Sequence, residues 1–239
     1  MTGRPAIAFV ALCLFVAPLR AQDLDEAAIA RALKAGADDK FSSWTAGCRA
    51  EVSRADRRAA IGPLRPTGSY DVVVSTPLGA VAFIASQARR SGKTLGVADV
   101  PPWALHAAVH VFVEPRKPPR DWNAGASGEM PMVDVPSSIE RVVLNSKAAP
   151  ASVPPEPKDF ARAPASFSED SWLDSQLPNQ IGPDGRPRPM VFENSRARAA
   201  FSLESIKALA AGDLDVVVVT RDAERRCSIG ARDRARLFP

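Results

Sequence analysis

The triplet Gly92-Lys93-Thr94 repeats the last three residues of a phosphate-binding P-loop. In a P-loop the glycines follow a strand, and a helix begins at the lysine, so that its amides face the phosphates. Here the residues before the triplet, Leu78–Ala88, have the apolar spacing of a helix, and Gly92 is expected to end that helix. The position of the first P-loop glycine holds Gln87. We therefore expect no nucleotide binding.

His106 and His110 have the spacing of a zinc-binding HExxH helix, but alanine replaces the general-base glutamate of that motif. Glu114 could serve as a third metal ligand. The alternating valines of residues 109–113 favour a strand over a helix at this point. We expect both histidines to be structural or solvent-facing, and the chain to hold no metal and no cofactor.

A catalytic function has only diffuse support. Serine and aspartate are numerous, but the chain lacks a GxSxG motif, and a serine triad would need His106 or His110 as its base. Neither Cys48 nor Cys227 lies in a thiol-enzyme signature, and spacing alone does not locate a pair of catalytic carboxylates. No catalytic residue is assigned, and a secreted hydrolase with its acid and base in loops remains the alternative function.

The N-terminal residues have the organisation of a secretory signal peptide. A basic start is followed by a short apolar run and by Ala21 at a cleavage position, which makes residues 1–21 the expected signal. Removing them lowers the net charge from +4 to +2, because Arg4 and Arg20 are lost with no acidic residue. The protein is expected to be periplasmic or extracellular, with no transmembrane segment after cleavage.

Two cysteines remain after the removal of Cys13 with the signal peptide. In an oxidising compartment a single pair usually joins, so we predict a disulfide between Cys48 and Cys227. Two separate thiols are the alternative.

Tryptophan supplies the remaining candidates for ligand contact. Trp122 and Trp172 lie in irregular, polar or proline-rich stretches, where an exposed ring could bind a sugar or a peptide. The simpler interpretation is that each tryptophan fastens an irregular segment to the core.

The distribution of proline divides the chain. After the signal peptide we expect an N-terminal part of a single α+β domain at residues 22–147, then a proline-rich extended connection at 148–165, then a C-terminal part at 166–239 with hairpins and a short helix. Within the connection, residues 150–164 are expected to have neither helix nor strand.

The expected fold class is α+β, with a mostly antiparallel or mixed sheet, possibly sandwich-like, two or three packed helices and long proline-rich loops. Helices are expected from Asp25 to Gly36 and from Thr76 to Arg90, with a short one after Ser202. Valine-rich runs predict strands at 70–75, 109–113, 139–146 and 213–220, with a last strand at 224–229 and a hairpin turning at Asn194-Ser195.

These features favour an exported, non-catalytic binding or scaffolding domain whose ligand and partner in the envelope or outside are unknown. Acidic residues are interleaved with the basic clusters, and no aromatic residues accompany them, so nucleic-acid binding is not expected.

Overall fold

The computed structural model describes residues 24–52, 64–65, 68–116, 133–134, 136–146, 149–155, 157–167, 190–209 and 212–238. The apolar N-terminal segment, Trp122 and Trp172 lie outside these residues, so the expectations placed on them stay predictions.

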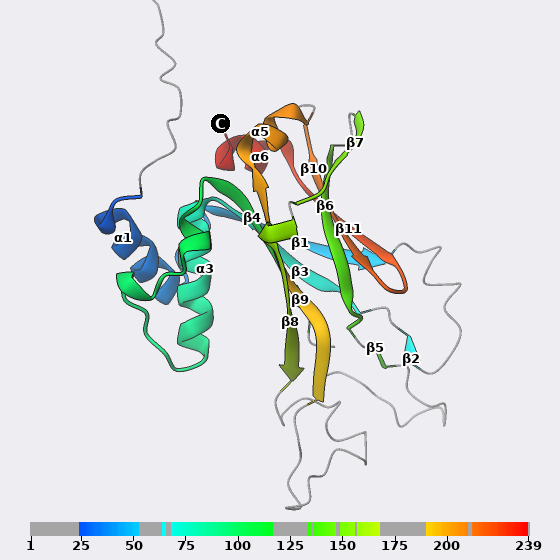
Figure 1. Cartoon of the computed structure of the whole chain (residues 1–239), viewed down its shortest axis with the longest axis horizontal. Helices are drawn as coiled ribbons and strands as arrows, with labels where there is room; N and C mark the ends of the chain where they lie inside the picture. The colour runs from blue at the N-terminus through cyan, green and yellow to red at the C-terminus, as the bar shows by residue number, and fades with distance from the viewer. Residues whose placement is uncertain are drawn as a thin grey trace, which may run out of the picture.

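A curled nine-stranded sheet dominates the described part of the chain, and all its neighbouring strands are antiparallel (Figure 1). The order across the sheet is β7-β6-β10-β11-β1-β3-β4-β9-β8. Its strands are β1 (Thr45–Val52), β3 (Tyr70–Ser75), β4 (Ala108–Pro115), β6 (Ile139–Ser146), β7 (Ala149–Val153), β8 (Phe160–Phe167), β9 (Met190–Ser202), β10 (Leu214–Thr220) and β11 (Glu224–Ile229). A separate parallel pair is formed by β2 (Leu64–Arg65) and β5 (Val133–Asp134).

The helices are α1 (Glu26–Ala37), α3 (Pro77–Arg90), α5 (Leu203–Ala208) and α6 (Ala231–Leu237), with short 3-10 turns η1 (Val97–Asp99), η2 (Pro102–Leu105) and η3 (Pro157–Asp159). Figure 1 shows α1 and α3 on one side of the sheet and α5 and α6 at one end of it.

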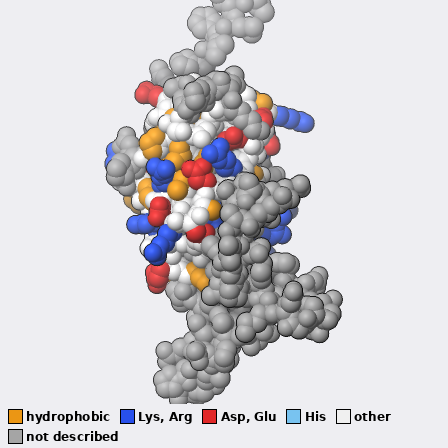
Figure 2. All heavy atoms as spheres, turned by 90° about the vertical axis from the view of Figure 1, so that its right-hand side faces the viewer, with side chains coloured by type: hydrophobic (Ala, Val, Ile, Leu, Met, Phe, Trp, Pro, Cys, Tyr) orange, Lys and Arg blue, Asp and Glu red, His pale blue; other side chains and the backbone are white. Residues whose placement is uncertain are grey.

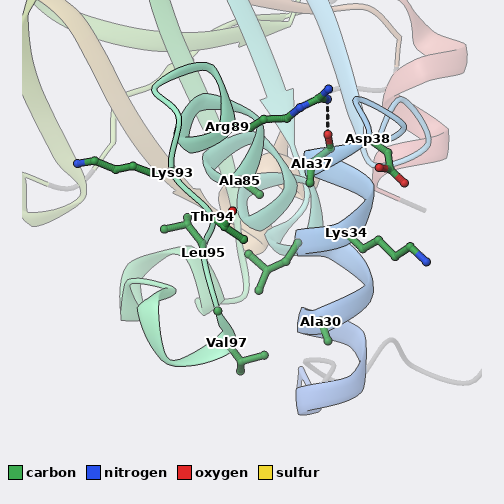
Figure 3. A pocket seen from close by; sticks show the side chains of 12 residues that line it. Ala30, Lys34, Ala37, Asp38, Ala85, Arg89, Lys93, Thr94, Leu95 and Val97 are labelled. Carbon is green, nitrogen blue, oxygen red and sulfur yellow. Dashed lines mark hydrogen bonds between the residues drawn. The ribbon is translucent and has the colours of Figure 1, made fainter.

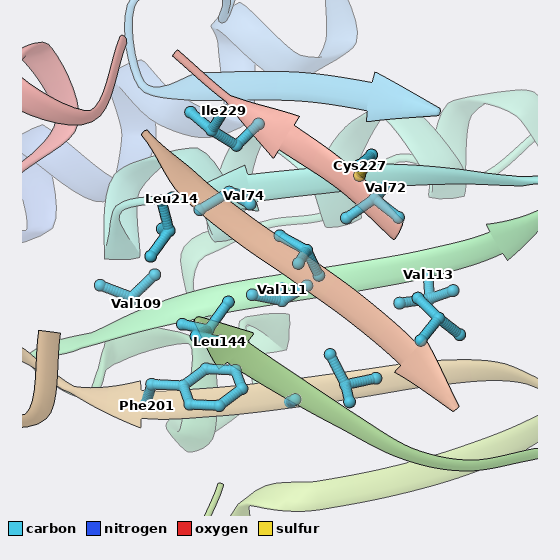
Figure 4. Packing of buried hydrophobic residues seen from close by; sticks show 14 of the residues in the cluster. Val72, Val74, Val109, Val111, Val113, Leu144, Phe201, Leu214, Cys227 and Ile229 are labelled. Atoms are coloured by element: carbon cyan, nitrogen blue, oxygen red, sulfur yellow. The ribbon is translucent and has the colours of Figure 1, made fainter. Parts of the chain in front are cut away.

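The main hydrophobic core lies on the inner face of the sheet. Val109, Val111 and Val113 alternate along β4 and are fully buried, as the sequence predicts. Leu144 of β6 and Leu214 of β10 belong to the same cluster. Because these strands come from opposite halves of the strand order, the sheet must curl to bring their side chains together, and Figure 4 shows β10 crossing over β4 with the core between them.

Both long helices begin with the side-chain caps that the sequence predicts. Asp25 caps α1 by accepting a hydrogen bond from a backbone N–H three residues on, at 2.5 Å, and Thr76 caps α3 in the same way at 3.3 Å. Gly92 follows α3 with a φ of 71°, the left-handed conformation that favours glycine at a helix end. The sequence therefore encodes where α3 begins and where it ends.

Gly36 does not end the first helix, because α1 continues to Ala37. A Cβ atom at Gly36 would lie 2.1 Å from the carbonyl oxygen of Ala82 in α3. The glycine therefore allows the two helices to approach closely, which is a packing role. Together the helices cover the outer face of β3 and β4, where the ring of Phe83 stacks on that of Phe112 with centroids 4.3 Å apart.

The predicted cysteine pair lies at the junction between β1 and β11. The sulfur atoms of Cys48 and Cys227 are 2.11 Å apart and the Cα atoms 5.7 Å apart, which is disulfide-bonding distance. The ladder between these two strands contains only Glu51 opposite Arg226 and Val52 opposite Arg225. The cysteine pair thus reinforces a short ladder between the two halves of the sheet.

The prediction that residues 150–164 have neither helix nor strand is wrong. These residues include most of β7 and the start of β8, which form the two edges of the sheet. Pro150 lies in β7, and Pro164 lies in β8 where its pairing with β9 shifts register. Proline lacks a backbone N–H donor, but an edge strand needs donors on one side only, so proline is tolerated there.

The predicted hairpin at Asn194-Ser195 is also wrong, because β9 runs without a break from Met190 to Ser202. Asn194 has a φ of 53° and lies opposite the point where β8 shifts register, between Ala163 and Ala165. The turn-forming residues therefore make an irregularity within one strand.

The α+β class is confirmed, although sheet predominates over helix. Among the described residues, no helix combines the length and apolar character needed to cross a bilayer.

Candidate functional site

A cavity of about 610 Å³ lies between α1, α3 and the segment 93–97 (Figure 3). We call it the α1–α3 pocket. Its apolar lining includes Leu33 of α1 and Ala85 of α3, with half-buried Leu95 and Val97 from the third segment. Pockets for small molecules have volumes of about 300–1,000 Å³, so this cavity is of suitable size.

The lining also carries more positive than negative charge. Lys34, Arg89 and Lys93 contribute three cations, and Asp38 contributes the single anion. In Figure 3 the Lys34 and Lys93 side chains extend outward on opposite sides of the pocket. Thr94 adds a hydroxyl group to the same lining.

Arg89 has a structural role at the upper wall of this pocket. Its guanidinium donates a hydrogen bond to the carbonyl oxygen of Ala37 and lies 3.6 Å from the carboxylate of Asp39. Ser86 donates to the same carboxylate at 2.7 Å. These contacts join the C-terminal ends of α1 and α3 and fix the pocket's shape.

The Gly92-Lys93-Thr94 triplet therefore has a place in the candidate site, although it is not a P-loop. It follows α3 instead of preceding a helix, and Lys93 and Thr94 line the α1–α3 pocket. The sequence correctly predicts a turn after the helix, but it does not show that this turn lies beside α1. The signal for that contact is Gly36, at which the sequence predicts the end of the first helix.

His110 has none of the contacts of a catalytic base among the described residues. Its side chain is fully buried, and Nε2 donates to the carbonyl oxygen of His106 at 3.3 Å, which leaves Nδ1 as an acceptor with no hydrogen-bond donor. Burial lowers the pKa of His110 to about 4. The nearby Ser75 hydroxyl donates to the His110 backbone oxygen, at 3.4 Å, and not to the ring.

The two histidines also do not form a metal site with other residues that the structure describes. His106 is exposed beyond η2, and no group of three or more potential ligands occurs among the described residues. The expected structural and solvent-facing roles fit His110 and His106 respectively.

The two tryptophans that the structure describes pack irregular segments against the hydrophobic core. Trp44 and Trp103 lie half-buried against the outer hydrophobic cluster. The guanidinium of Arg198 stacks 3.8 Å from the centre of the Trp103 ring, and burial lowers the pKa of this arginine.

A second arginine of β9 forms an ion pair. Arg196 lies 2.7 Å from the carboxylate of Glu114, and burial raises the pKa of Glu114 despite this partner.

The basic C-terminal region contains a buried arginine, although the charges there are interleaved in sign along the sequence. Arg225 is fully buried, donates from Nε to the Gly68 carbonyl at 2.7 Å and lies 3.4 Å from Asp222. It also lies 5.3 Å from the ring centre of Tyr70, whose hydroxyl donates to the Ser137 carbonyl at 2.6 Å. Burial raises the pKa of Tyr70 to about 12. This network fastens the start of β3 to β11.

The exposed charges around β11 form local pairs of opposite sign. Arg226 lies 2.8 Å from Glu224, and Arg49 lies 3.9 Å from Glu51 on the neighbouring β1. Figure 2 shows acidic and basic side chains interspersed on the face that it presents. These pairs fit a solvated surface better than a surface for a polyanion.

Comparison with protein-family models, curated proteins and solved structures found no match for this chain.

Proposed function

We propose that the chain is an exported, non-catalytic binding domain and that the α1–α3 pocket is its ligand site. The observation that carries this proposal is a cavity of about 610 Å³ formed by three chain segments beside a sheet whose inner face is filled by apolar side chains. In such an arrangement the sheet supplies rigidity, and the pocket supplies a concave surface for a ligand.

Export is part of the proposal and is supported by two features. Residues 1–21 have the pattern of a signal peptide, and Cys48 and Cys227 lie at disulfide distance, as in proteins of oxidising compartments. The proposal keeps two finer expectations from the sequence, a sandwich-like packing of the sheet and long proline-rich connections.

Photo-cross-linking in living cells tests the site. A benzophenone amino acid is placed at Thr94, in the pocket, or at Ser228, which is exposed on β11. We expect a discrete adduct from position 94 and none from position 228. Adducts of equal yield at both positions, or at neither, would contradict a binding site at the pocket.

A panel of hydrolase substrates tests the absence of catalysis. We expect no turnover above that of a His106→Gln/His110→Gln double variant. Hydrolysis that the double variant loses, while it keeps its fold, would favour the secreted hydrolase.

A further inference from the structure

We propose that the α1–α3 pocket binds a free amphipathic anion, an unbranched alkyl chain that ends in a carboxylate. This inference rests on the proposed function of the pocket and adds the chemical class of its ligand. Three observations support it: the floor of the pocket is apolar, cations outnumber anions in its lining, and the C-terminal carbonyls of α1 and α3 already accept hydrogen bonds from other groups.

The floor of the pocket suits an alkyl chain. Leu33, Ala85, Leu95 and Val97 present only hydrocarbon, and Ala30 and Ala37 leave room beside them on α1. An alkyl chain gains from leaving water for such a surface without needing directed hydrogen bonds.

The lining cations could instead have the simple role of stabilising helix C-termini, which attract positive charge. The last carbonyls of α1 already have other partners: backbone N–H groups of Asp38, Asp39 and Lys40 donate to them, and Arg89 donates to Ala37. Lys34 is therefore not needed as a cap.

The end of α3 is satisfied in the same way. The amides of Ser91, Gly92 and Lys93 donate to its last carbonyls. Among the described residues, neither Lys34 nor Lys93 has an acidic side chain within 4.0 Å, so both ammonium groups are available to a carboxylate.

The α1–α3 pocket thus has a hydrocarbon floor and, on each of two opposite sides, a lysine with no acidic partner among the described residues (Figure 3). The carboxylate of one bound ligand can meet the lysine on the side where its alkyl chain ends. A neutral amphiphile would leave the cations unused, and a cationic one would be repelled by them. A small hydrophilic anion would leave the floor exposed to water. A carboxylate on an alkyl chain satisfies both parts.

Calorimetric titration of the purified, oxidised protein with decanoate, dodecanoate and tetradecanoate, below their micelle concentrations, tests this inference. We expect saturable binding with one ligand per chain, and an affinity that rises about two- to fourfold for each added methylene. Dodecanol is expected to bind about two- to fivefold more weakly than dodecanoate, because one exposed ion pair is lost.

Charge variants assign the headgroup contacts. Lys34→Gln/Lys93→Gln removes the ion pair whichever lysine forms it, and is expected to weaken dodecanoate binding about two- to fivefold and to leave dodecanol binding unchanged. The matched control, Lys207→Gln/Arg232→Gln, removes two exposed cations on α5 and α6 and should leave both affinities unchanged. If both double variants behave alike, the assignment to this pocket is overturned.

Ala30→Trp provides a second variant that fills the pocket from an exposed position. It should abolish binding of the acid and of the alcohol while the melting temperature stays unchanged. Unchanged binding in this variant would overturn the site.

The remaining outcomes separate this inference from the proposed function. Equal affinity for acid and alcohol, no saturable binding, or binding only to anionic lipid vesicles overturns the ligand class. If the Thr94 cross-link persists in that case, the pocket remains a binding site for another ligand. Loss of the cross-link as well overturns both proposals.

Discussion

The interior of the sheet and the α1–α3 layer differ in how their polar groups are used. Inside the sheet, Arg225 is surrounded by acceptors and the cysteine pair joins two strands, so polar and covalent contacts hold the scaffold together. In the α1–α3 layer, Lys34 and Lys93 reach solvent beside an open cavity. If the α1–α3 pocket is the ligand site, as proposed, the sheet supplies most of the stability and the helices supply the binding surface. Substitutions in the two regions should therefore have separable effects.

The largest loss of stability is expected from Arg225→Ala. It leaves the buried Gly68 carbonyl without its charged donor and opens a cavity where the fully buried Arg225 side chain packs, and the two losses together cost about 3–5 kcal/mol. Dodecanoate binding by the folded fraction should be unchanged. Urea denaturation measures the loss.

The neighbouring Arg226→Ala is the matched control, because this side chain is 63% exposed and pairs with Glu224 at the surface. It should cost less than about 1 kcal/mol. Equal losses in the two variants would remove the distinction between the buried network and the surface.

The double variant Cys48→Ser/Cys227→Ser is expected to cost about 2–5 kcal/mol, because the cross-link spans 179 residues and restricts the unfolded chain. Urea denaturation of the variant and of the oxidised protein gives the difference. A loss below about 1 kcal/mol would show that the β1–β11 junction does not depend on the cysteine pair.

His110 gives the sheet a dependence on pH. Its pKa is about 4 when folded and about 6.5 when unfolded, so the unfolded state takes up the proton first as the pH falls. The contribution of His110 to the free energy of unfolding should be fully present above about pH 6.5 and should fall by about 3 kcal/mol by pH 4. His110→Leu removes this contribution, and the difference between the two proteins isolates it from the carboxylates that they share. A constant difference across pH 7 to 4 would contradict a buried neutral His110.

Gly36→Ala is expected to lower the free energy of unfolding by about 1–3 kcal/mol and to alter the α1–α3 pocket. The new Cβ would collide with the Ala82 backbone and push α1 away from α3. The affinity for dodecanoate should fall with it, since these helices form two walls of the pocket. Gly230→Ala is the control, because a Cβ there meets nothing within 4 Å. If Gly36→Ala is as neutral as this control, the close approach of the helices is not required.

Local rules predicted much of the scaffold. The caps at Asp25 and Thr76, the helix stop at Gly92 and the valine-rich strands follow from interactions within a few residues, which a sequence displays directly. The cysteine pair was predictable by elimination.

The errors share a physical cause. Gly36, Pro164 and Asn194 each have a strong local preference, for a helix stop, a loop and a turn. Each is used instead for a long-range purpose, as a helix contact, an edge strand and an irregularity in β9. The α1–α3 pocket was missed for the same reason, because it joins three segments through a contact between helices. The burial of Arg225 was missed because one of its acceptors, the Gly68 carbonyl, lies 157 residues away in the sequence.

Hydrogen–deuterium exchange with and without saturating dodecanoate tests most directly the claim that binding belongs to the helices and stability to the sheet. We expect added protection in peptides that cover residues 26–38 and 85–97, and unchanged exchange in β4, β10 and β11. Protection that appears in those strands and not in the two helical segments would contradict the account.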